Sequence, residues 1–461
     1  MELSHAGKTY DVVNPATGQV FAQAQDHDVG DLDAAISAAQ AAFASWSRDS
    51  DARRRALVAC SQAIRADAEA LGRLLMLEQG KPLAKAVGEV MGAARWFEHT
   101  AALALDSVTV RDDGDMHVVV HRRPLGVVAG IAPWNYPVMT AAWKIAPALL
   151  AGNTIVLKPS PFTPLSTLRL GEIIAPLLPD GVVAVVSGGD ALGAALAAHP
   201  AIRKVTFTGS TAAGKSIASA AGQDIKRLTL ELGGNDAAIV LDDIDPDAII
   251  EKLFWGAFQN TGQVCSAIKR LYIHESKFDA VVERLHDRVR RTVVGDGADP
   301  ATELGPLTTR QQLEIVRTLA ADSAERGARI LDGAVIPSSA GYFFAPTLVL
   351  GLADDAPLVV REQFGPLLPI LPFADEAEVI ERANATSFGL SGSVWSGNVE
   401  RATEIAAQLE CGTAWVNQHL SVLPDAPVSG RKWSGLGAEN GQWGLNGVLD
   451  LQTVSVAKVV A

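Results

Sequence analysis

Several short segments of this 461-residue chain combine residue types that could perform covalent chemistry. In the run NTGQVC, residues 260–265, small and flexible residues lead into a cysteine. The positive end of a helix dipole lowers the pKa of a nearby thiol, so a cysteine that starts a helix is a good nucleophile. We expect Cys265 to occupy such a position, with a buried and inert thiol as the alternative. Cys60, on an amphipathic helical face, and Cys411, at the head of a buried strand, are expected in the core.

A second segment, ELGG at residues 231–234, closes an apolar strand with a carboxylate. Burying a carboxylate at such a position costs free energy unless the group has a partner or a task. Glu231 is therefore a candidate functional residue. A solvated carboxylate at the end of the strand is the alternative interpretation.

Two further loops offer groups that could bind an oxygen atom or a phosphate. In PWNYP, residues 133–137, prolines on both sides hold Asn135, whose side-chain amide is a hydrogen-bond donor. In FTGST, residues 207–211, Gly209 and Ser210 separate an expected strand from an expected helix, where a backbone can approach a pyrophosphate. This is not the usual GxGxxG pattern, and each segment alone is also compatible with an ordinary turn.

The hydrophobic pattern predicts the elements that position these segments. Residues 30–105 are Ala-rich with a helical pattern, and from residue 115 onward strands and helices alternate. Strands are expected at 154–160, 182–188 and 204–210, with helices at 138–152, 164–178, 192–199 and 211–222. Such alternation predicts parallel β-α-β units and an open, doubly wound sheet, and a second alternating stretch covers residues 235–447. The tail 451–461 has the pattern of a strand, which would pair with residues 115–123 or with another chain.

Composition and charge argue against several classes of protein. Charged residues make up 20% of the chain, Asp and Glu outnumber Lys and Arg by 52 to 39, and no basic cluster is present, so no nucleic-acid partner is expected. The uncharged run 125–143 contains Pro133, Asn135 and Pro137, so a strand, loop and helix explain it better than a membrane span. The nine histidines form no ligand cluster, and we expect no metal site.

The cysteines and the first residues bear on location. Cys60, Cys265 and Cys411 are too far apart for a disulfide framework or a zinc knuckle, and they suit a reducing cytosol. The first residues lack a basic stretch followed by an apolar one, so no signal peptide is expected. We therefore expect a cytoplasmic protein without a membrane partner.

Taken together, these segments carry a resemblance that none of them carries alone. PWN, KPS, FTGS, ELGG and GQxC, in this order and at these spacings, resemble the NAD(P)-dependent aldehyde dehydrogenase superfamily of the non-acylating kind. The resemblance begins at NPATG, residues 14–18, and continues through REQFGP, residues 361–366, and SGLG, residues 434–437. It covers nearly the whole chain.

The resemblance implies a role for each reactive residue. Cys265 would be the nucleophile, and the Asn135 side chain with the Cys265 backbone N–H would form an oxyanion hole. Glu231 would activate the water that hydrolyses the thioester. Lys144 and Glu439 match positions near that base, where they would relay its proton or hold the electrostatics of the site.

The resemblance also implies a cofactor site for NAD or NADP. Lys158 and Glu362 would hold the riboses, and Phe364 would lie near the nicotinamide. Gly209 and Ser210 would contact the pyrophosphate, and Trp134 and Gly233 would line the cleft. Ser160 would lie near the adenosine ribose. The chain departs from the family pattern at Pro161, where the family often has Glu, at Asn235, where ELGGK becomes ELGGN, and in PVSGRKWSG, residues 427–435. Because Pro161 cannot bind a ribose hydroxyl, we expect use of both nucleotides with NAD modestly favoured.

The implied fold is α/β, with two doubly wound parallel-sheet domains and a small β oligomerisation arm. Residues 1–105 and 125–232 would form the dinucleotide-binding domain, 233–447 the catalytic domain, and 106–124 with 448–461 the arm of a homodimer or homotetramer. Apolar and aromatic residues around the site favour an aromatic or medium aliphatic aldehyde. The alternatives are a relative that passes the thioester to coenzyme A, a cysteine hydrolase that uses a histidine such as His274, and a catalytically idle protein on the same fold.

Overall fold

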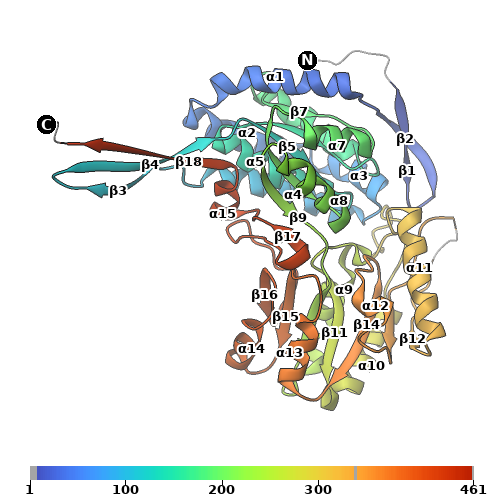
Figure 1. Ribbon diagram of the computed structural model, residues 1–461. Helices are drawn as coiled ribbons and strands as arrows, with labels where there is room; N and C mark the ends of the chain where they lie inside the picture. The colour runs from blue at the N-terminus through green and yellow to red at the C-terminus, as the bar shows by residue number, and fades with distance from the viewer. Residues whose placement is uncertain (1–7, 337–339, 459–461) are drawn as a thin grey trace.

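The computed structural model describes residues 8–336 and 340–458, which form two α/β bodies and a long, thin β arm (Figure 1). The expected fold of two doubly wound sheets with a separate arm is confirmed. Within the described ranges, none of the helices combines the length and the apolar character that crossing a membrane would need.

The first body is built on a six-stranded sheet in the order β17-β9-β8-β5-β6-β7. All neighbours are parallel except β17, which pairs antiparallel with β9 at the edge. The strands of this sheet are β5 (Val127–Ile131), β6 (Thr154–Lys158), β7 (Val183–Val185), β8 (Ile202–Thr208), β9 (Arg227–Glu231) and β17 (Gly435–Leu436). The helices around it are α1 (Val29–Trp46), α2 (Ser50–Ala66), α3 (Ala68–Gln79), α4 (Leu83–Ala101), α5 (Pro137–Ala151), α6 (Leu165–Ile174), η1 (Ala175–Leu177), α7 (Asp190–Ala198), α8 (Thr211–Gly222) and α15 (Gly441–Asn446).

Helices cover both faces of this sheet because its central strands are apolar on both sides. On one face, Val128 and Ile155 join a core cluster with residues of α2, α4, α5 and α6. On the other face, Val127 and Val156 join a cluster with residues of α1 and α7. Neighbouring residues of one strand thus enter opposite cores, as the two-residue period of a strand requires.

The second body is built on a seven-stranded sheet in the order β12-β13-β14-β11-β10-β15-β16, in which only β12 and β13 pair antiparallel. Its strands are β10 (Asp236–Val240), β11 (Ile268–His274), β12 (Arg329–Leu331), β13 (Thr347–Leu350), β14 (Leu367–Phe373), β15 (Ser391–Trp395) and β16 (Thr413–Val416). The helices are α9 (Pro246–Phe258), η2 (Gln259–Gly262), η3 (Glu275–Lys277), α10 (Phe278–Arg290), α11 (Arg310–Glu325), α12 (Pro357–Val360), α13 (Glu376–Asn384), α14 (Val399–Ala406) and η4 (Lys432–Ser434). Core clusters again lie on both faces.

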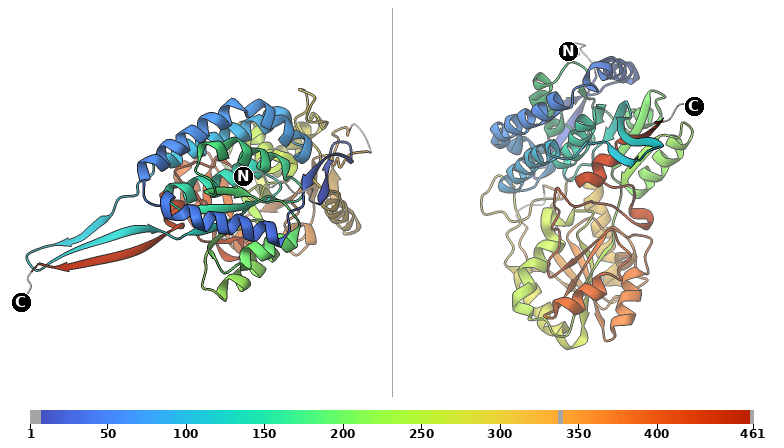
Figure 2. Two further views of the ribbon diagram at one scale, coloured as in Figure 1. Left: turned by 90° about the horizontal axis from the view of Figure 1, so that it is seen from above. Right: turned by 90° about the vertical axis from the view of Figure 1, so that its left-hand side faces the viewer.

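The arm is a three-stranded antiparallel sheet that projects from the first body (Figure 2). Its strands are β3 (Val108–Asp112), β4 (Met116–Pro124) and β18 (Leu449–Ala457), in the order β18-β4-β3. The C-terminal strand pairs with β4 of its own chain, from Leu449 opposite Pro124 to Ala457 opposite Met116. Of the two pairings that the sequence left open for the tail, the structure shows the one within the chain. Residues 459–461 of the tail lie outside the described ranges.

Two smaller features complete the fold. A hairpin of β1 (Thr9–Asn14) and β2 (Gln19–Gln25) stands beside the first body. The short strand β17, which the sequence analysis placed inside 233–447, pairs with β9 of the first sheet. The chain therefore returns to the first body before it enters the arm, and the predicted domain boundaries stay a prediction.

Candidate active site

A cleft of about 380 Å³ lies at the carboxyl ends of β5, β6, β8 and β9, where open α/β sheets bind ligands. Residues of the second body close its other side. The cleft gathers most residues that the sequence singled out, namely Trp134, Asn135, Lys158, Ser160, Pro161, Gly209, Ser210, Gly233, Cys265, Glu362 and Phe364. Glu231, Lys144 and Glu439 do not line the cleft and lie buried behind it.

Cys265 does not start a helix, so that expectation is wrong. Helix α9 ends at Phe258, the single turn η2 follows, and Cys265 lies in a turn just before β11. Strand β11 begins at Ile268, three residues after the cysteine, which leaves no room for a helix. No helix dipole therefore lowers the pKa of this thiol.

The loop before Cys265 has an unusual backbone. Asn260, Thr261 and Gly262 have φ angles of 52°, 58° and 73°, and left-handed conformations are costly for the first two. Hydrogen bonds hold the loop in place: the Thr261 hydroxyl donates to the Gly305 carbonyl at 2.8 Å, and Lys269 Nζ donates to the Gly262 carbonyl at 2.7 Å. The surrounding structure thus imposes the shape of the segment that carries the thiol.

Burial raises the pKa of the Cys265 thiol to about 12, and the nearby carboxylates of Glu362, Asp236 and Glu231 add to the effect. The thiol is therefore protonated at neutral pH and needs a base before it can attack.

Asn135 lies at the junction between β5 and α5, with 6% of its surface exposed. Its side-chain Nδ2 donates one hydrogen bond to the Gln263 carbonyl at 2.9 Å, two residues before Cys265. An amide group has two N–H donors, so this bond leaves the second for another acceptor. The contact also joins the first body to the nucleophile loop of the second.

Glu231 ends β9 and is only 4% exposed, which argues against a solvated carboxylate. Among the described residues, neither of its carboxyl oxygens has a hydrogen-bond partner. Burial, together with repulsion from Glu439, raises its pKa well above the usual range, while Lys144 opposes that shift. A carboxyl group with a raised pKa can take up and release a proton near neutral pH.

Lys144 and Glu439 form a buried ion pair, with Nζ 2.6 Å from Oε1. Lys144 Nζ also donates to the Thr208 hydroxyl at 2.7 Å, and the Thr206 hydroxyl donates to Glu439 Oε1 at 2.8 Å. Thr208 lies opposite Glu231 in the pairing of β8 with β9. The pair therefore lies next to the strand end that carries the candidate base.

The two glycines of ELGG have separate packing reasons. A Cβ atom on Gly233 would collide with the Glu362 carboxylate, and one on Gly234 would collide with the Cys265 carbonyl oxygen. The Gly234 N–H also donates to Glu362 Oε1 at 3.0 Å. Only glycine allows both Glu362 and the cysteine loop to approach the end of β9 so closely.

The outer part of the cleft offers groups that fit a dinucleotide. Burial lowers the pKa of Lys158 to about 8, with Asp190 and Asp26 acting in the opposite direction. Ser210 is the N-cap of α8, so the positive end of this helix faces the cleft beside Gly209. At the inner end, the rings of Trp134 and Phe364 meet edge to face, with their centroids 5.2 Å apart. An ammonium, a helix N-terminus and the Glu362 carboxylate are suited to riboses and a pyrophosphate.

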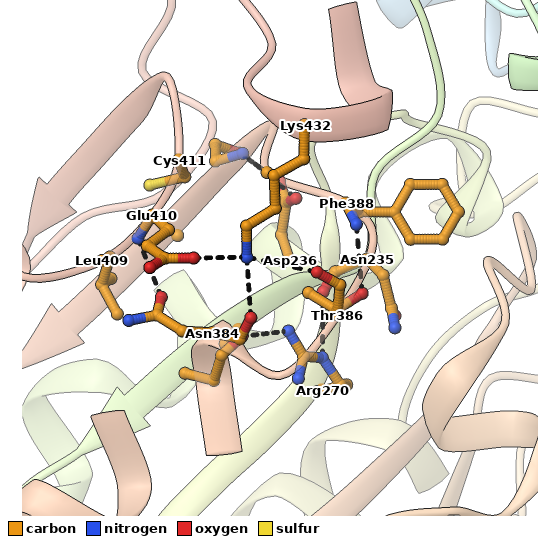
Figure 3. A pocket seen from close by; sticks show the side chains of 15 residues that line it. Asn235, Asp236, Arg270, Asn384, Thr386, Phe388, Leu409, Glu410, Cys411 and Lys432 are labelled. Atoms are coloured by element: carbon orange, nitrogen blue, oxygen red, sulfur yellow. Dashed lines mark hydrogen bonds and ion pairs between the residues drawn. The ribbon is translucent and has the colours of Figure 1, made fainter. Parts of the chain in front are cut away.

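Asn235, one of the positions where the sequence departs from the family pattern, lies outside this cleft. Its Nδ2 donates to the Val359 carbonyl at 2.8 Å, and the residue lines a separate cavity together with Asp236, Arg270 and Lys432 (Figure 3). That cavity, at about 20 Å³, is large enough for one water molecule. The substitution therefore changes the packing behind the cleft and not its lining.

Sequence reasoning missed several residues around the thiol. His419, from the loop after β16, contacts the Ser266 carbonyl through Nε2 at 2.8 Å and the Ser393 hydroxyl through Nδ1 at 2.9 Å. Burial lowers its pKa to about 4, so the ring is neutral and Nε2 carries the proton. Lys269 is fully buried beneath the loop, where burial lowers its pKa to about 8. A lone histidine or lysine had no spacing signal that could have revealed these contacts.

The other predicted features are placed as follows. Cys60 is fully buried in a core cluster, and half-buried Cys411 donates to the Thr413 carbonyl at 3.2 Å. His274 ends β11, a seven-residue strand that separates it from Cys265 by roughly 20 Å. Its Nδ1 contacts the Ser276 hydroxyl. In the parts of the chain that the structure describes, no group of three acidic, histidine or cysteine side chains could hold a metal ion.

A thiol at the inner end of a dinucleotide-shaped cleft, on two doubly wound sheets, defines the class of nucleotide-dependent oxidoreductases. Residues 3–454 match the model of the aldehyde dehydrogenase family. The chain is 40% identical to phenylacetaldehyde dehydrogenase of Pseudomonas fluorescens, over 95% of this chain and 90% of that protein. It is 37% identical to human retinal dehydrogenase 2, over 98% of this chain and 89% of that protein.

Solved structures agree over the same length. An NAD+ complex of aldehyde dehydrogenase from Bacillus cereus has a TM-score of 0.95 at 35% identity, covering 98% of this chain and 94% of that one. An NADP-dependent enzyme of Escherichia coli has a TM-score of 0.95 at 36% identity, covering 98% and 95%. The chain belongs to the aldehyde dehydrogenase family and is an NAD(P)-dependent aldehyde dehydrogenase, which confirms the resemblance found in the sequence.

Proposed function

We propose that this enzyme oxidises an aromatic or medium aliphatic aldehyde to its carboxylic acid through a covalent intermediate on Cys265. The observation that carries the proposal is a set of three groups: the Cys265 thiol and the Asn135 amide, which line the cleft, and the buried, unpartnered Glu231 carboxyl group, whose charge acts on the thiol. Each supports a different step, and all three are required for oxidation followed by hydrolysis.

The first step is acylation of Cys265. The thiol proton passes to water, the sulfur forms a bond to the aldehyde carbon, and the carbonyl electron pair moves onto the oxygen. The second Asn135 N–H and the Cys265 backbone N–H donate to this oxyanion, and one such donor contributes about 3–4 kcal/mol in the transition state. The bound nicotinamide supplies the acceptor for the hydride that leaves this carbon. A thioester then remains on Cys265.

The second step is hydrolysis of the thioester. Glu231 takes a proton from water while the water oxygen attacks the thioester carbon. The bond between carbon and sulfur breaks, the carboxylic acid leaves, and the cysteine sulfur is restored. The Lys144–Glu439 pair receives the proton from Glu231 or stabilises its charge. Transfer of the thioester to coenzyme A does not need such a base.

The preference between NAD and NADP depends on the outer end of the cleft. Pro161 offers neither a hydrogen bond to a ribose hydroxyl nor a charge that would repel a 2′-phosphate. Asp190, at the first position of α7, lines the same end of the cleft as Lys158 and supplies a negative charge there. We propose that the Asp190 carboxylate gives NAD a modest advantage, while Lys158 keeps NADP usable.

The apolar surroundings support an uncharged substrate. Arg270, a candidate partner for a second carboxylate, is 4% exposed and donates to the carbonyls of Asn235, Arg382 and Ala383. Its guanidinium group is therefore already paired. Tyr136, Met139, Trp143, Val264 and Ser266 and the loop 418–427 are the proposed substrate contacts, whereas Phe258 packs in the core against Phe254. The relatives named above are a phenylacetaldehyde and a retinal dehydrogenase, so their substrates differ at similar identity.

We further propose that the enzyme is a homodimer or homotetramer in the cytoplasm. The arm exposes large apolar side chains, including Val110 at 58% and Leu451 at 74%, which a partner subunit would cover. The three cysteines are free thiols, as expected in a reducing compartment.

The test is a panel of aldehydes assayed by absorbance at 340 nm with NAD+ and with NADP+. We expect kcat/KM to be highest for phenyl-substituted or medium-chain aldehydes and lowest for semialdehydes that carry a carboxylate. The product should be the free acid. A preference for charged semialdehydes would contradict the substrate class. An acyl-coenzyme A product, in assays that also contain coenzyme A, would contradict hydrolysis by Glu231.

A further inference from the structure

A second buried ion pair lies near the site, outside the residues discussed so far. Lys81 Nζ pairs with Glu89 Oε2, and the two residues are only 3% and 4% exposed. Lys81 lies in the turn between α3 and α4, and Glu89 lies on α4. Buried ion pairs are costly to desolvate and contribute little to stability on average, so the remaining contacts of both groups matter.

The remaining contacts of both side chains go to one turn, residues 135–139. Lys81 Nζ donates to the Asn135 carbonyl at 2.9 Å and lies 3.8 Å above the centre of the Tyr136 ring. Glu89 Oε1 accepts the backbone N–H groups of Val138 at 3.0 Å and Met139 at 3.1 Å. Lys81 therefore binds the start of this turn and Glu89 binds its end.

Glu89 takes the place of a missing helix cap. Helix α5 has Tyr136 as its N-cap, and this residue makes no side-chain capping bond. The first N–H groups of a helix have no partner within the helix, and a carboxylate at this end is favoured. Glu89 supplies that carboxylate from another helix, which fixes α5 and the residue before its N-cap relative to α4.

The Asn135 carboxamide is fixed from the opposite side. Its Nδ2 donates to the Gln263 carbonyl, as described above, and the Asn260 side chain donates to the Asn135 carbonyl at 3.2 Å. The backbone carbonyl of Asn135 is thus held by Lys81 and by Asn260, and its side chain is held by the Gln263 carbonyl. The direction of the second amide N–H depends on both anchors.

The Lys81 turn is itself tied to the nucleophile loop. The Lys81 backbone N–H donates to Gln79 Oε1 at 3.1 Å, and Gln79 Nε2 donates to the Thr308 hydroxyl at 2.9 Å. The Thr308 backbone N–H donates in turn to Gln263 Oε1 at 2.9 Å. Gln263 also accepts from Asn135, so the hydrogen bonds form a closed ring through Asn135, Lys81, Gln79, Thr308 and Gln263. This ring fixes the distance between Asn135 and Cys265.

We propose that Lys81 and Glu89 are positioning residues that clamp the turn 135–139, so that the Asn135 amide points at the oxyanion. The proposal rests on the proposed function of Asn135 as an oxyanion donor. Neither residue touches the cofactor cleft. Loss of the clamp should therefore lower kcat and leave nucleotide binding unchanged.

The experiment compares Lys81→Met and Glu89→Gln in two backgrounds, the native chain and Asn135→Ala. One oxyanion donor contributes about 100-fold or more to kcat, so a misdirected donor should cost at least about tenfold in the native background. KM for NAD+ should change by less than about twofold. In the Asn135→Ala background the same substitutions should lower kcat by less than about threefold, because the positioned group is gone.

Lys226→Met is the matched control. Lys226 is also a buried lysine, and its Nζ donates to the His199 carbonyl at 2.7 Å, but it lies just before β9, at the end opposite Glu231. It should lower the melting temperature without a loss in kcat. Glu89→Gln is nearly isosteric and removes the negative charge that pairs with Lys81, so it provides the test if Lys81→Met does not fold.

Three outcomes are distinguishable. Equal losses of kcat in both backgrounds, or a loss matched by Lys226→Met, would reduce the pair to a structural role and overturn the proposal. Unchanged kcat in Lys81→Met and Glu89→Gln, with a large loss in Asn135→Ala, would overturn it as well but leave the proposed function intact. Unchanged kcat in Asn135→Ala would overturn the proposed role of Asn135 itself, and the clamp with it.

Discussion

The state of the thiol is the main question at the scale of single residues. With its pKa raised to about 12, Cys265 does not depend on a preformed thiolate. The buried Glu231 is the candidate base, and its own pKa is also raised. Burial thus disfavours the charged form of both groups.

The assignment of the nucleophile is tested by single cysteine variants. Cys265→Ala should abolish the formation of NAD(P)H, because the covalent bond to sulfur cannot form, while NAD+ should still quench protein fluorescence on binding. Cys60→Ala and Cys411→Ala should keep turnover within a fewfold, since both thiols lie apart from the cleft. Substantial activity in Cys265→Ala would disprove the assignment.

The base is tested by pre-steady-state kinetics. Glu231→Gln should allow one burst of NAD(P)H and then slow sharply, because acylation needs Cys265 and Asn135, whereas hydrolysis needs the base. If Glu231 also deprotonates the thiol, the burst shrinks as well. A steady-state rate equal to that of the native enzyme would show that Glu231 is not the base.

The pH dependence of the native enzyme follows from the same group. A raised pKa means that Glu231 is protonated, and inactive as a base, at low pH. Turnover limited by hydrolysis should therefore rise as pH increases and fall as pH decreases. In Glu231→Gln the slow phase should lose this dependence, which stopped-flow measurements across a pH series would reveal.

Cofactor choice is tested at two positions of the outer cleft. Pro161→Glu should shift the ratio of kcat/KM for NAD+ over NADP+ toward NAD+ by at least about tenfold, which corresponds to roughly 1.4 kcal/mol. Asp190→Ala should shift the ratio in the opposite direction. A native enzyme that uses NADP+ at less than about a thousandth of the NAD+ rate would contradict our interpretation of Pro161.

At the scale of elements, the site depends on where strands end and how closely loops approach them. The end of β9 can receive both Glu362 and the Cys265 loop only because residues 233 and 234 have no side chain. The neighbouring end of α5 is held by a carboxylate from α4. Active-site geometry is therefore set by contacts between elements and not by any one of them.

Gly234→Ala tests this close approach. The added methyl group would displace the Cys265 carbonyl, so we expect a loss of about 1–3 kcal/mol in unfolding free energy, together with a large loss in kcat. Gly222→Ala is the control, because open space surrounds its Cβ position at the end of α8. That variant should be neutral or slightly more stable. Thermal unfolding and turnover at 340 nm would measure both effects.

At the scale of the whole molecule, the arm projects from the first body and has no core of its own (Figure 2). A three-stranded sheet with exposed valines and leucines on its surface is marginal in water without further packing. Large exposed apolar side chains on β3 and β18 support the proposed contact of the arm with a second subunit.

Charged substitutions on the arm should lower the mass of the particle in solution. Val110→Asp and Leu451→Asp place a carboxylate where a partner would pack, so light scattering should show smaller species. Val399→Asp is the control, since Val399 is 58% exposed at the start of α14 in the second body. A mass that both arm variants leave unchanged would contradict the proposed role of the arm.

The sequence by itself determined the order of elements and pointed to the candidates for the reactive residues. Apolar runs with a two-residue or helical period are local features, and they predicted the strands around residues 154, 182 and 204 close to where the structure has them. The motif residues of the cleft were also visible, because glycines, a cysteine and a carboxylate at strand ends have few structural roles.

Only the tertiary structure decided which side chains meet. Pairing of β11 with β10 and β14 fixed the strand at Ile268 and removed the helix expected at Cys265. Lys81 lies 54 residues from Asn135, and Lys144 lies 295 residues from Glu439, so no periodicity connects either pair. A hydrogen bond requires atoms within about 3 Å, and for distant segments that distance is set by how the whole chain packs.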